Sequence, residues 1–219
     1  MIRFGHLDID FDERVLRPRA WTARQSEWAA ELSAGLPDGP MLELCSGAGQ
    51  IGLLAASMTS RRLVCVDANP VACAFTRANA ERAGLADLVE VRHGSMEHAL
   101  DPDERFCLVI ADPPWVPTAQ VERYPEDPRT AIDGGADGML VAEACLDTID
   151  RHLSPDGSAV LQLGTAAQAA RLREMVGDLR VQEIRDSPGE GVLVHLARAA
   201  ESSMSGDPSG YRRAEGKVG

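Results

Sequence analysis

The stretch 41–52, with the sequence MLELCSGAGQIG, constrains the fold of this chain more than any other feature. A short apolar run ends in the turn sequence SGAG, and helix-like sequence begins at Gln50. This order predicts a buried strand, a tight glycine turn, and a helix whose N-terminus faces the end of the strand. Glycines let the backbone approach a ligand closely, and free N–H groups at a helix start bind polar or anionic groups. In an open α/β sheet, a nucleotide-like cofactor binds at such a turn.

The rest of the chain alternates between short apolar runs and helix-like segments. We expect strands at 41–45, 62–66, 88–92, 106–111 and 158–163, helices at 70–83, 137–152 and 165–177, and a final hairpin at 180–185 and 191–197. Strands that alternate with helices form a parallel sheet with right-handed crossovers. The expected fold is therefore α/β, with a Rossmann-like, mostly parallel sheet that ends in an antiparallel hairpin.

Three regions are expected along the sequence. Residues 1–36 contain an alternating segment and a helical pattern with Trp21 and Trp28, which predicts a hairpin and a helix that pack on the core. Residues 37–199 form the main domain. Residues 200–219 consist mostly of Ser, Gly, Pro and charged residues, and we expect them to be a disordered tail.

Composition excludes several classes of protein. The formal net charge of −12 counts against a DNA or RNA substrate, because phosphate attraction dominates nucleic-acid affinity. The five cysteines are scattered without a C-x-x-C pair, which favours reduced thiols over disulfides or a metal site. No signal peptide or long apolar span is evident, so we expect a soluble, cytoplasmic protein that does not enter the membrane.

Two features indicate an adenosine-bearing ligand without identifying it. Gly47, Gly49 and Gly52 match the G-x-G-x-x-G fingerprint of dinucleotide-binding proteins, so an NAD-dependent dehydrogenase is one interpretation. Asp67 ends the second expected strand, twenty residues after Gly47. A carboxylate at this position accepts hydrogen bonds from ribose hydroxyls in enzymes that use NAD or S-adenosylmethionine (SAM).

The sequence Asp112-Pro113-Pro114-Trp115 favours one cofactor over the other. It follows the apolar strand 106–111 and so lies at the cofactor edge of the sheet. The two prolines fix the backbone and leave carbonyl groups free, Asp112 supplies an acceptor, and Trp115 supplies a flat wall. Such a loop can orient the nitrogen of a planar amide or amine toward an electrophilic methyl group. Hydride transfer does not need this arrangement.

Together these motifs resemble the class I SAM-dependent methyltransferases, and most closely the HemK-type protein glutamine methyltransferases. That family carries Asn-Pro-Pro-Tyr at the position of residues 112–115. The segments VLRPR at 15–19 and IDGGADGM at 132–139 are similar to its V-L-I-P-R and G-G-x-D-G-L segments. The resemblance covers about residues 7 to 165.

The resemblance implies roles for individual residues. Cys45, Ser46, Gly47, Ala48 and Gly49 would surround the methionine part of SAM. Asp67 would hold the ribose, and Met96 would lie against the adenine. Asp112, Pro113, Pro114 and Trp115 would hold the acceptor nitrogen, with Asp112 also near SAM, and S-adenosylhomocysteine (SAH) would be the product.

Several positions depart from the family. Cys45 replaces the usual first glycine, and Asp112 replaces asparagine, so an ionised side chain there only accepts hydrogen bonds. Only a hairpin and a helix precede the fold, whereas HemK-type enzymes carry an N-terminal domain that binds the release factor. We therefore expect a SAM-dependent methyltransferase for a small amine- or amide-bearing acceptor. The alternatives are methylation of a protein glutamine or a nucleic-acid base, and a non-catalytic protein that binds SAM or a nucleotide.

Overall fold

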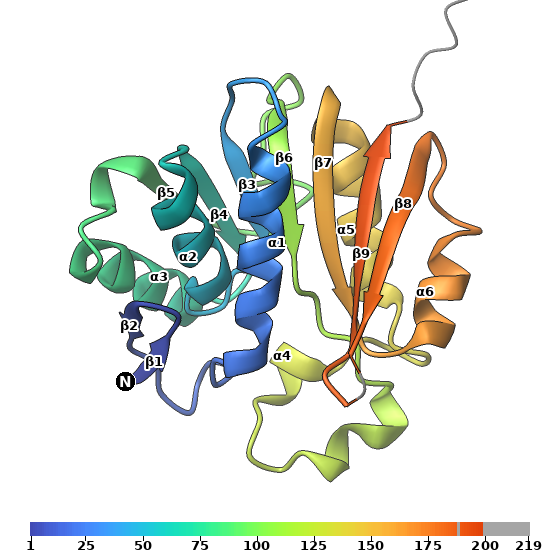
Figure 1. Ribbon diagram of the computed structural model, residues 1–219. Coiled ribbons are helices and arrows are strands. Elements are labelled where there is room, and N and C mark those ends of the chain that lie inside the picture. The colour runs from blue at the N-terminus through green and yellow to red at the C-terminus, as the bar shows by residue number, and fades with distance from the viewer. Residues whose placement is uncertain (188, 199–219) are drawn as a thin grey trace, which may run out of the picture.

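The computed structural model describes residues 1–187 and 189–198. Its centre is a seven-stranded sheet with the strand order β5-β4-β3-β6-β7-β9-β8 (Figure 1). The strands of this sheet are β3 (Met41–Leu44), β4 (Leu63–Asp67), β5 (Val89–His93), β6 (Phe106–Ala111), β7 (Leu153–Leu163), β8 (Leu179–Asp186) and β9 (Val192–Arg198). A separate hairpin is formed by β1 (Ile2–Phe4) and β2 (Leu7–Ile9).

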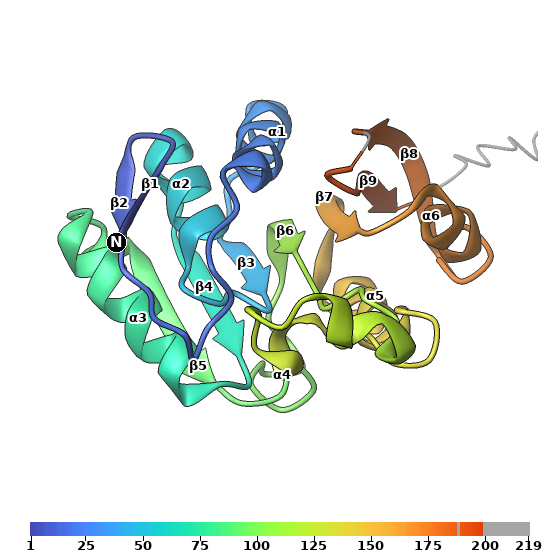
Figure 2. The same ribbon diagram turned by 90° about the horizontal axis from the view of Figure 1, so that it is seen from below.

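Helices cover both faces of the sheet (Figure 2). On one face lie α1 (Ala23–Ser33), α2 (Gln50–Thr59) and α3 (Pro70–Arg82), whose buried residues share a core cluster. On the other face lie α5 (Leu140–His152) and α6 (Ala166–Leu172), which belong to a second cluster. The shorter helical segments are η1 (Ala20–Thr22), η2 (Ala86–Leu88), η3 (Thr118–Arg123) and α4 (Arg129–Ile132).

Strand direction confirms the predicted fold class. β3 pairs in parallel with both β4 and β6, β4 pairs in parallel with β5, and β6 pairs in parallel with β7. β9 runs antiparallel to both β7 and β8. From β3 the sheet first grows in one direction, through β4 to β5, and then in the other direction, through β6 to β7. The carboxyl ends of β3, β4 and β6 meet at this topological switch point. Ligands of open α/β sheets bind in the crevice at such a point.

Some segments differ from the sequence-based expectation. β7 begins at Leu153, five residues before the expected start, and α6 ends at Leu172 rather than near residue 177. The expected loop 116–136 contains η3 and α4. The N-terminal hairpin and helix form as expected, and Trp28 is fully buried against the core. The whole of the expected tail, residues 200–219, lies outside the described residues.

Within residues 1–187 and 189–198, no helix is long and apolar enough to cross a membrane. The same part of the chain contains no group of three or more His, Cys, Asp or Glu residues that could hold a metal ion. All five cysteines are free thiols.

Candidate active site

A cavity of about 620 Å³ lies at the switch point of the sheet. Its volume is typical of sites that bind small molecules and cofactors. Six of the predicted site residues line this cavity, namely Cys45, Gly47, Asp67, Met96, Asp112 and Pro114. The sequence motifs therefore converge on one space.

The turn after β3 has the backbone conformation that glycine favours. Gly47 has a φ of 56° and Gly49 a φ of 80°, and Cys45 also lies in the left-handed region with a φ of 56°. This conformation explains why a glycine is usual at the position of Cys45. Ser46, Ala48 and Gly49 also belong to this turn, but they are buried and do not line the cavity. A Cβ atom at Gly49 would lie 2.7 Å from Cγ2 of Thr76, so the turn packs closely on α3.

Asp67 is held in place by two backbone donors. The Gly47 N–H donates to Oδ2 at 2.8 Å, and the Asn69 N–H donates to Oδ1 at 2.8 Å. Each carboxylate oxygen keeps a free lone pair, as the expected ribose contact requires. Burial raises the pKa of Asp67, although the two backbone hydrogen bonds oppose this shift. The cap of α3 is supplied by Asn69, which accepts from the Val71 N–H.

Glu43 is a buried carboxylic acid that was not predicted from the sequence, and it does not itself line the cavity. It lies in the middle of β3, and its Oε1 accepts a hydrogen bond from the Gly52 N–H at 2.8 Å. A Cβ atom at position 52 would lie 2.7 Å from Cδ of Glu43 and would overlap Oε2. Gly52 is thus required by the Glu43 carboxyl group. Gly52 therefore matches the third glycine of the dinucleotide fingerprint because it packs on Glu43, and not because it contacts a dinucleotide. The sequence signal for this contact was Glu43 itself, a charged residue inside an apolar strand.

The Asp112–Trp115 loop is only partly exposed to the cavity. Asp112 and Pro114 line the cavity, whereas Pro113 is buried and Trp115 does not line it. The Trp115 ring lies over Gly164, where a Cβ atom would be 2.8 Å from Cδ2 of the indole. The Trp115 carbonyl is also not free, because it accepts from Nε2 of Gln168 at 3.0 Å. The expectation that Trp115 forms a flat wall of the site does not match this placement.

The electrostatics of the cavity favour a ligand with positive charge. Burial raises the pKa of Asp112 to about 7 and that of Glu43 to about 8. The charges of Asp67 and Asp112 also contribute to the shift at Glu43. Within the described part of the chain, none of these three carboxyl groups forms an ion pair. A cationic group in the cavity would favour the ionised forms of Asp67 and Asp112, whereas a pyrophosphate would disfavour them.

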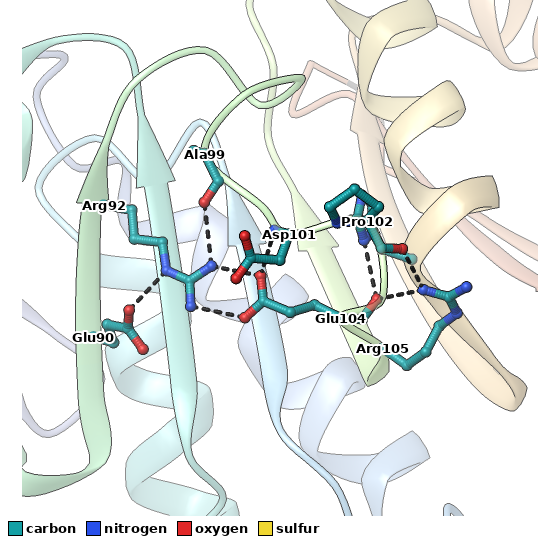
Figure 3. Close-up of polar contacts among 8 residues, drawn as sticks. Glu90, Arg92, Ala99, Asp101, Pro102, Glu104 and Arg105 are labelled. Atoms are coloured by element: carbon teal, nitrogen blue, oxygen red, sulfur yellow. Dashed lines mark hydrogen bonds and ion pairs between the residues drawn. The ribbon is translucent and has the colours of Figure 1, made fainter.

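An ion-pair network around Arg92 holds the segment that follows Met96. Residues 94–97 follow β5 and line the cavity. Figure 3 shows Arg92 between Glu90 and Glu104, with N···O distances of 2.7 Å to each. The same guanidinium donates to the Ala99 carbonyl at 3.1 Å. Arg92 therefore ties the far end of the Met96 loop back to β5 and lowers the pKa of both glutamates.

Two segments that are distant in sequence cover the cavity. Val15 and Leu16 line it from the N-terminal side, and Leu16 packs against the apolar cluster of the 116–132 loop. Nη2 of Arg19 donates to both carboxylate oxygens of Asp127, at 2.7 and 2.6 Å. The Asp127 carboxylate is only 6% exposed. The VLRPR segment is thus fixed to the loop that follows the Asp112–Trp115 sequence.

One of two buried polar atoms near the turn fits a polar ligand. Ser46 Oγ and Gln50 Oε1 are buried and have no hydrogen-bond partner among the described residues. Gln50 lines the cavity at the N-terminus of α2. Buried polar atoms are normally hydrogen-bonded, so Gln50 Oε1, which belongs to a residue that lines the cavity, is suited to accept a hydrogen bond from a polar ligand, whereas Ser46 does not line the cavity. An unpartnered acceptor at this place fits the ammonium group in the amino-acid part of a cofactor such as SAM.

Comparison with known proteins finds relatives that are named as methyltransferases. It is 30% identical over 203 residues to the ribosomal protein uL3 glutamine methyltransferase of Burkholderia pseudomallei, covering 87% of this chain and 65% of that protein. It is 27% identical over 206 residues to the release factor glutamine methyltransferase of Gloeobacter violaceus, covering 90% of this chain and 72% of that protein. The chain spans less than two thirds of the length of the first curated relatives that it matches.

The fold has counterparts among solved structures. The N-terminal domain of human METTL16, solved in complex with SAH, superimposes with a TM-score of 0.62 at 15% sequence identity. The match covers 87% of this chain and 75% of that chain. At this level of identity the likeness concerns the fold.

The strand order and the antiparallel C-terminal hairpin are those of the Rossmann-like methyltransferase fold, and the relatives described above are named as protein glutamine methyltransferases. Residues 6–126 match the family described as Conserved hypothetical protein 95, and the chain belongs to that family.

Proposed function

We propose that this protein is a SAM-dependent methyltransferase that methylates nitrogen. The observation that carries the proposal is the convergence of the glycine turn, Asp67 and Asp112 on one cavity, where neither carboxyl group forms an ion pair with another described residue. SAM carries a sulfonium charge, and NAD carries a pyrophosphate. The charge of the site therefore supports SAM.

The residues present can hold each part of the cofactor. We assign the methionine part to the turn of Cys45 and Gly47 and to the free oxygen of Gln50. The carboxylate of Asp67 would accept from the ribose hydroxyls, and Met96 would pack against the adenine. When bound, SAM supplies an electrophilic methyl group on a positively charged sulfur.

Asp112 is the residue that we assign to the acceptor. An ionised carboxylate there accepts a hydrogen bond from the acceptor N–H and so orients the nitrogen lone pair toward the cavity. Its pKa of about 7 also suits it to take the proton that the nitrogen loses once it carries a methyl group. In its protonated form the same side chain both donates and accepts, as asparagine does.

We propose the side-chain amide of a protein glutamine as the first acceptor. Relatives of this chain are named as glutamine methyltransferases of ribosomal protein uL3 and of release factors. Such a substrate would place the enzyme in the cytoplasm. A small primary amine is the second candidate, because an ionised Asp112 accepts from both protons of an amine. The net charge of −12 disfavours a nucleic-acid base.

Calorimetry tests the cofactor. SAM and SAH should bind the wild type, NAD should not, and Asp67→Ala should lose most of the affinity because two ribose hydrogen bonds disappear. Asp87→Ala is a matched control, since it removes an exposed carboxylate of η2 that does not line the cavity. Binding of NAD in place of SAM would overturn the proposal.

Mass spectrometry tests the acceptor. The enzyme is incubated with SAM and with uL3 or the release factors of the source organism, and a glutamine should gain the mass of one methylene group. Asp112→Ala should abolish this gain while SAH still binds. Transfer only to small amines would support the second candidate. SAH binding with no transfer to any acceptor would favour a binding protein without catalytic activity.

A further inference from the structure

The Asp112–Trp115 loop has few donors of its own with which to anchor its backbone. Pro113 and Pro114 have no N–H groups, so the loop cannot form the usual ladder bonds. Its carbonyl groups can still be held by donors from elsewhere. The structure supplies such donors at both ends of the loop, and both come from glutamine side chains.

Gln25 holds the peptide group directly before Asp112. This residue lies in the first turn of α1 and is fully buried. Its Nε2 donates to the Ala111 carbonyl at 2.9 Å and to the Val160 carbonyl at 3.0 Å. Its Oε1 is buried without a partner among the described residues. A buried, half-satisfied amide is unfavourable in itself, so the two donated bonds are what this side chain contributes.

Gln168 holds the other end of the loop. It lies in α6, and its Nε2 donates to the Trp115 carbonyl at 3.0 Å and to the Asp137 carbonyl at 3.2 Å. Its Oε1 accepts from the N–H groups of Gly164 and Thr165 at 2.9 and 3.1 Å. The Gln168 side chain therefore caps α6 through its oxygen and donates a hydrogen bond to the loop through its nitrogen.

The two glutamines approach the loop from opposite sides of the sheet. α1 belongs to the face that packs in one core cluster, and α6 belongs to the face of the other cluster (Figure 2). We propose that Gln25 and Gln168 are positioning residues that fix the two ends of the Asp112–Trp115 loop and thereby aim Asp112 into the cavity. The role of the two glutamines in fixing the loop does not depend on the proposed function, whereas the role of the loop in methyl transfer does.

Gln168→Glu separates the two tasks of Gln168. The glutamate keeps an oxygen for the Gly164 and Thr165 N–H groups, because Glu is as suitable as Gln in a capping box. It replaces the amide donor with an oxygen that repels the Trp115 carbonyl. Thr165→Ala is the matched control, since it removes the hydrogen bond from the Gln168 N–H to Thr165 Oγ1 and leaves the loop contact in place.

Gln25→Met tests the other end of the loop. Methionine has a similar volume and shape but cannot donate to the Ala111 carbonyl. Ser26→Ala is its control, because Ser26 is the next residue of α1, is also buried, and donates to the Ile51 carbonyl of α2 at 2.8 Å. Each pair of variants therefore loses hydrogen bonds of the same helix, with only one member of the pair touching the loop.

Hydrogen exchange reports on the loop without any acceptor. In Gln168→Glu and Gln25→Met, the amides of Asp112, Trp115 and Val116 should exchange roughly tenfold faster than in wild type. Peptides from β3 and β4 should be unchanged, and SAH affinity measured by calorimetry should be retained. Neither control should alter exchange at the loop. Unchanged loop exchange in both glutamine variants, or equal changes in the controls, would overturn the inference.

Turnover gives a second readout once an acceptor is available. Misplacing a reacting group by about 1 Å can lower a rate on the order of a hundredfold, so kcat should fall far more than SAH affinity in both glutamine variants. A change in SAH affinity equal to the change in kcat would indicate a general structural role and would contradict the proposal. If wild type transfers no methyl group to any acceptor, the proposed function fails, and loop exchange alone decides the role of the two glutamines.

Discussion

The Glu43 carboxyl group occupies the space that a side chain at position 52 would need. Its Oε1 accepts from the Gly52 N–H at 2.8 Å, and a Cβ atom at position 52 would lie 2.7 Å from its Cδ. A charged residue inside a buried strand and a glycine inside the first turns of a helix are thus one structural unit. The pair holds β3 to α2 directly beneath the cofactor turn.

Gly52→Ala should destabilise the protein by about 1–3 kcal/mol, the range for overpacking a core. Urea denaturation measures the change. The double variant Glu43→Ala/Gly52→Ala should be less destabilised than the sum of the two single variants, because removal of the carboxyl group makes room for the new methyl group. Strict additivity, or a Gly52→Ala protein as stable as wild type, would contradict the steric relationship.

Glu43 should make the protein less stable as the pH rises. Burial raises its pKa from 4.5 to about 8, so between these values the folded chain retains a proton that the unfolded chain has lost. The free energy of unfolding therefore falls with increasing pH across this interval, by an amount on the order of a few kcal/mol. Asp67 and Asp112 are shifted in the same direction.

Glu43→Gln provides the test of this pH dependence. Glutamine keeps an oxygen for the Gly52 N–H but cannot ionise. Urea denaturation of both proteins at about pH 5 and about pH 8 should show a smaller loss of stability in the variant. Equal losses in the two proteins would mean that Glu43 ionises without cost in the folded state.

Binding of SAM near neutral pH should release protons from Asp112. The carboxyl group has a pKa of about 7 because it is buried, and a nearby sulfonium charge favours its ionised form. SAH lacks this charge and should release fewer protons. Calorimetric titrations in phosphate and in Tris, which differ in ionisation enthalpy, measure the number released. Asp112→Asn should abolish the difference between the two ligands, and its persistence would assign the proton to another group.

Cys45→Gly should leave stability unchanged or raise it by up to about 1 kcal/mol, since glycine adopts a positive φ without strain. Contact with the Cys145 thiol and burial raise the pKa of Cys45, so no thiolate charge is lost in the variant. Cys65→Gly is the matched control: this thiol is fully buried in β4, where removal of a side chain lowers stability. Chemical denaturation compares the two, and a larger loss at position 45 would contradict the strain argument.

The fold and half of the site follow from local sequence. The apolar strands are buried on both faces, so their pattern and the turns between them predict a parallel sheet. Gly47 and Asp67 were predictable because each directly follows or ends a strand at the same edge of the sheet. Asp112 was predictable for the same reason.

The remaining site features depend on contacts between distant segments. Gln25 reaches a carbonyl 86 residues further along the chain, and no periodicity of α1 distinguishes it from a core residue. Trp115 turns away from the cavity because Gly164, at the end of β7, leaves room for its ring. Such complementarity between side chains and glycines on other elements is a property of the packed molecule and has no local sequence pattern.

The ion pair between Arg19 and Asp127 joins residues that are 108 positions apart. Closing so large a loop carries an entropic cost that must be met before the contact stabilises the chain, so we expect this contact to form after the more local strand pairings. The parallel strands β3, β4 and β6 can therefore assemble, with Asp67 and Asp112 at their ends, before the VLRPR segment covers the cavity. During synthesis on a ribosome, the N-terminal segment must wait for more than a hundred further residues before its partner exists. The cavity should therefore be able to enclose a ligand only after the sheet has formed.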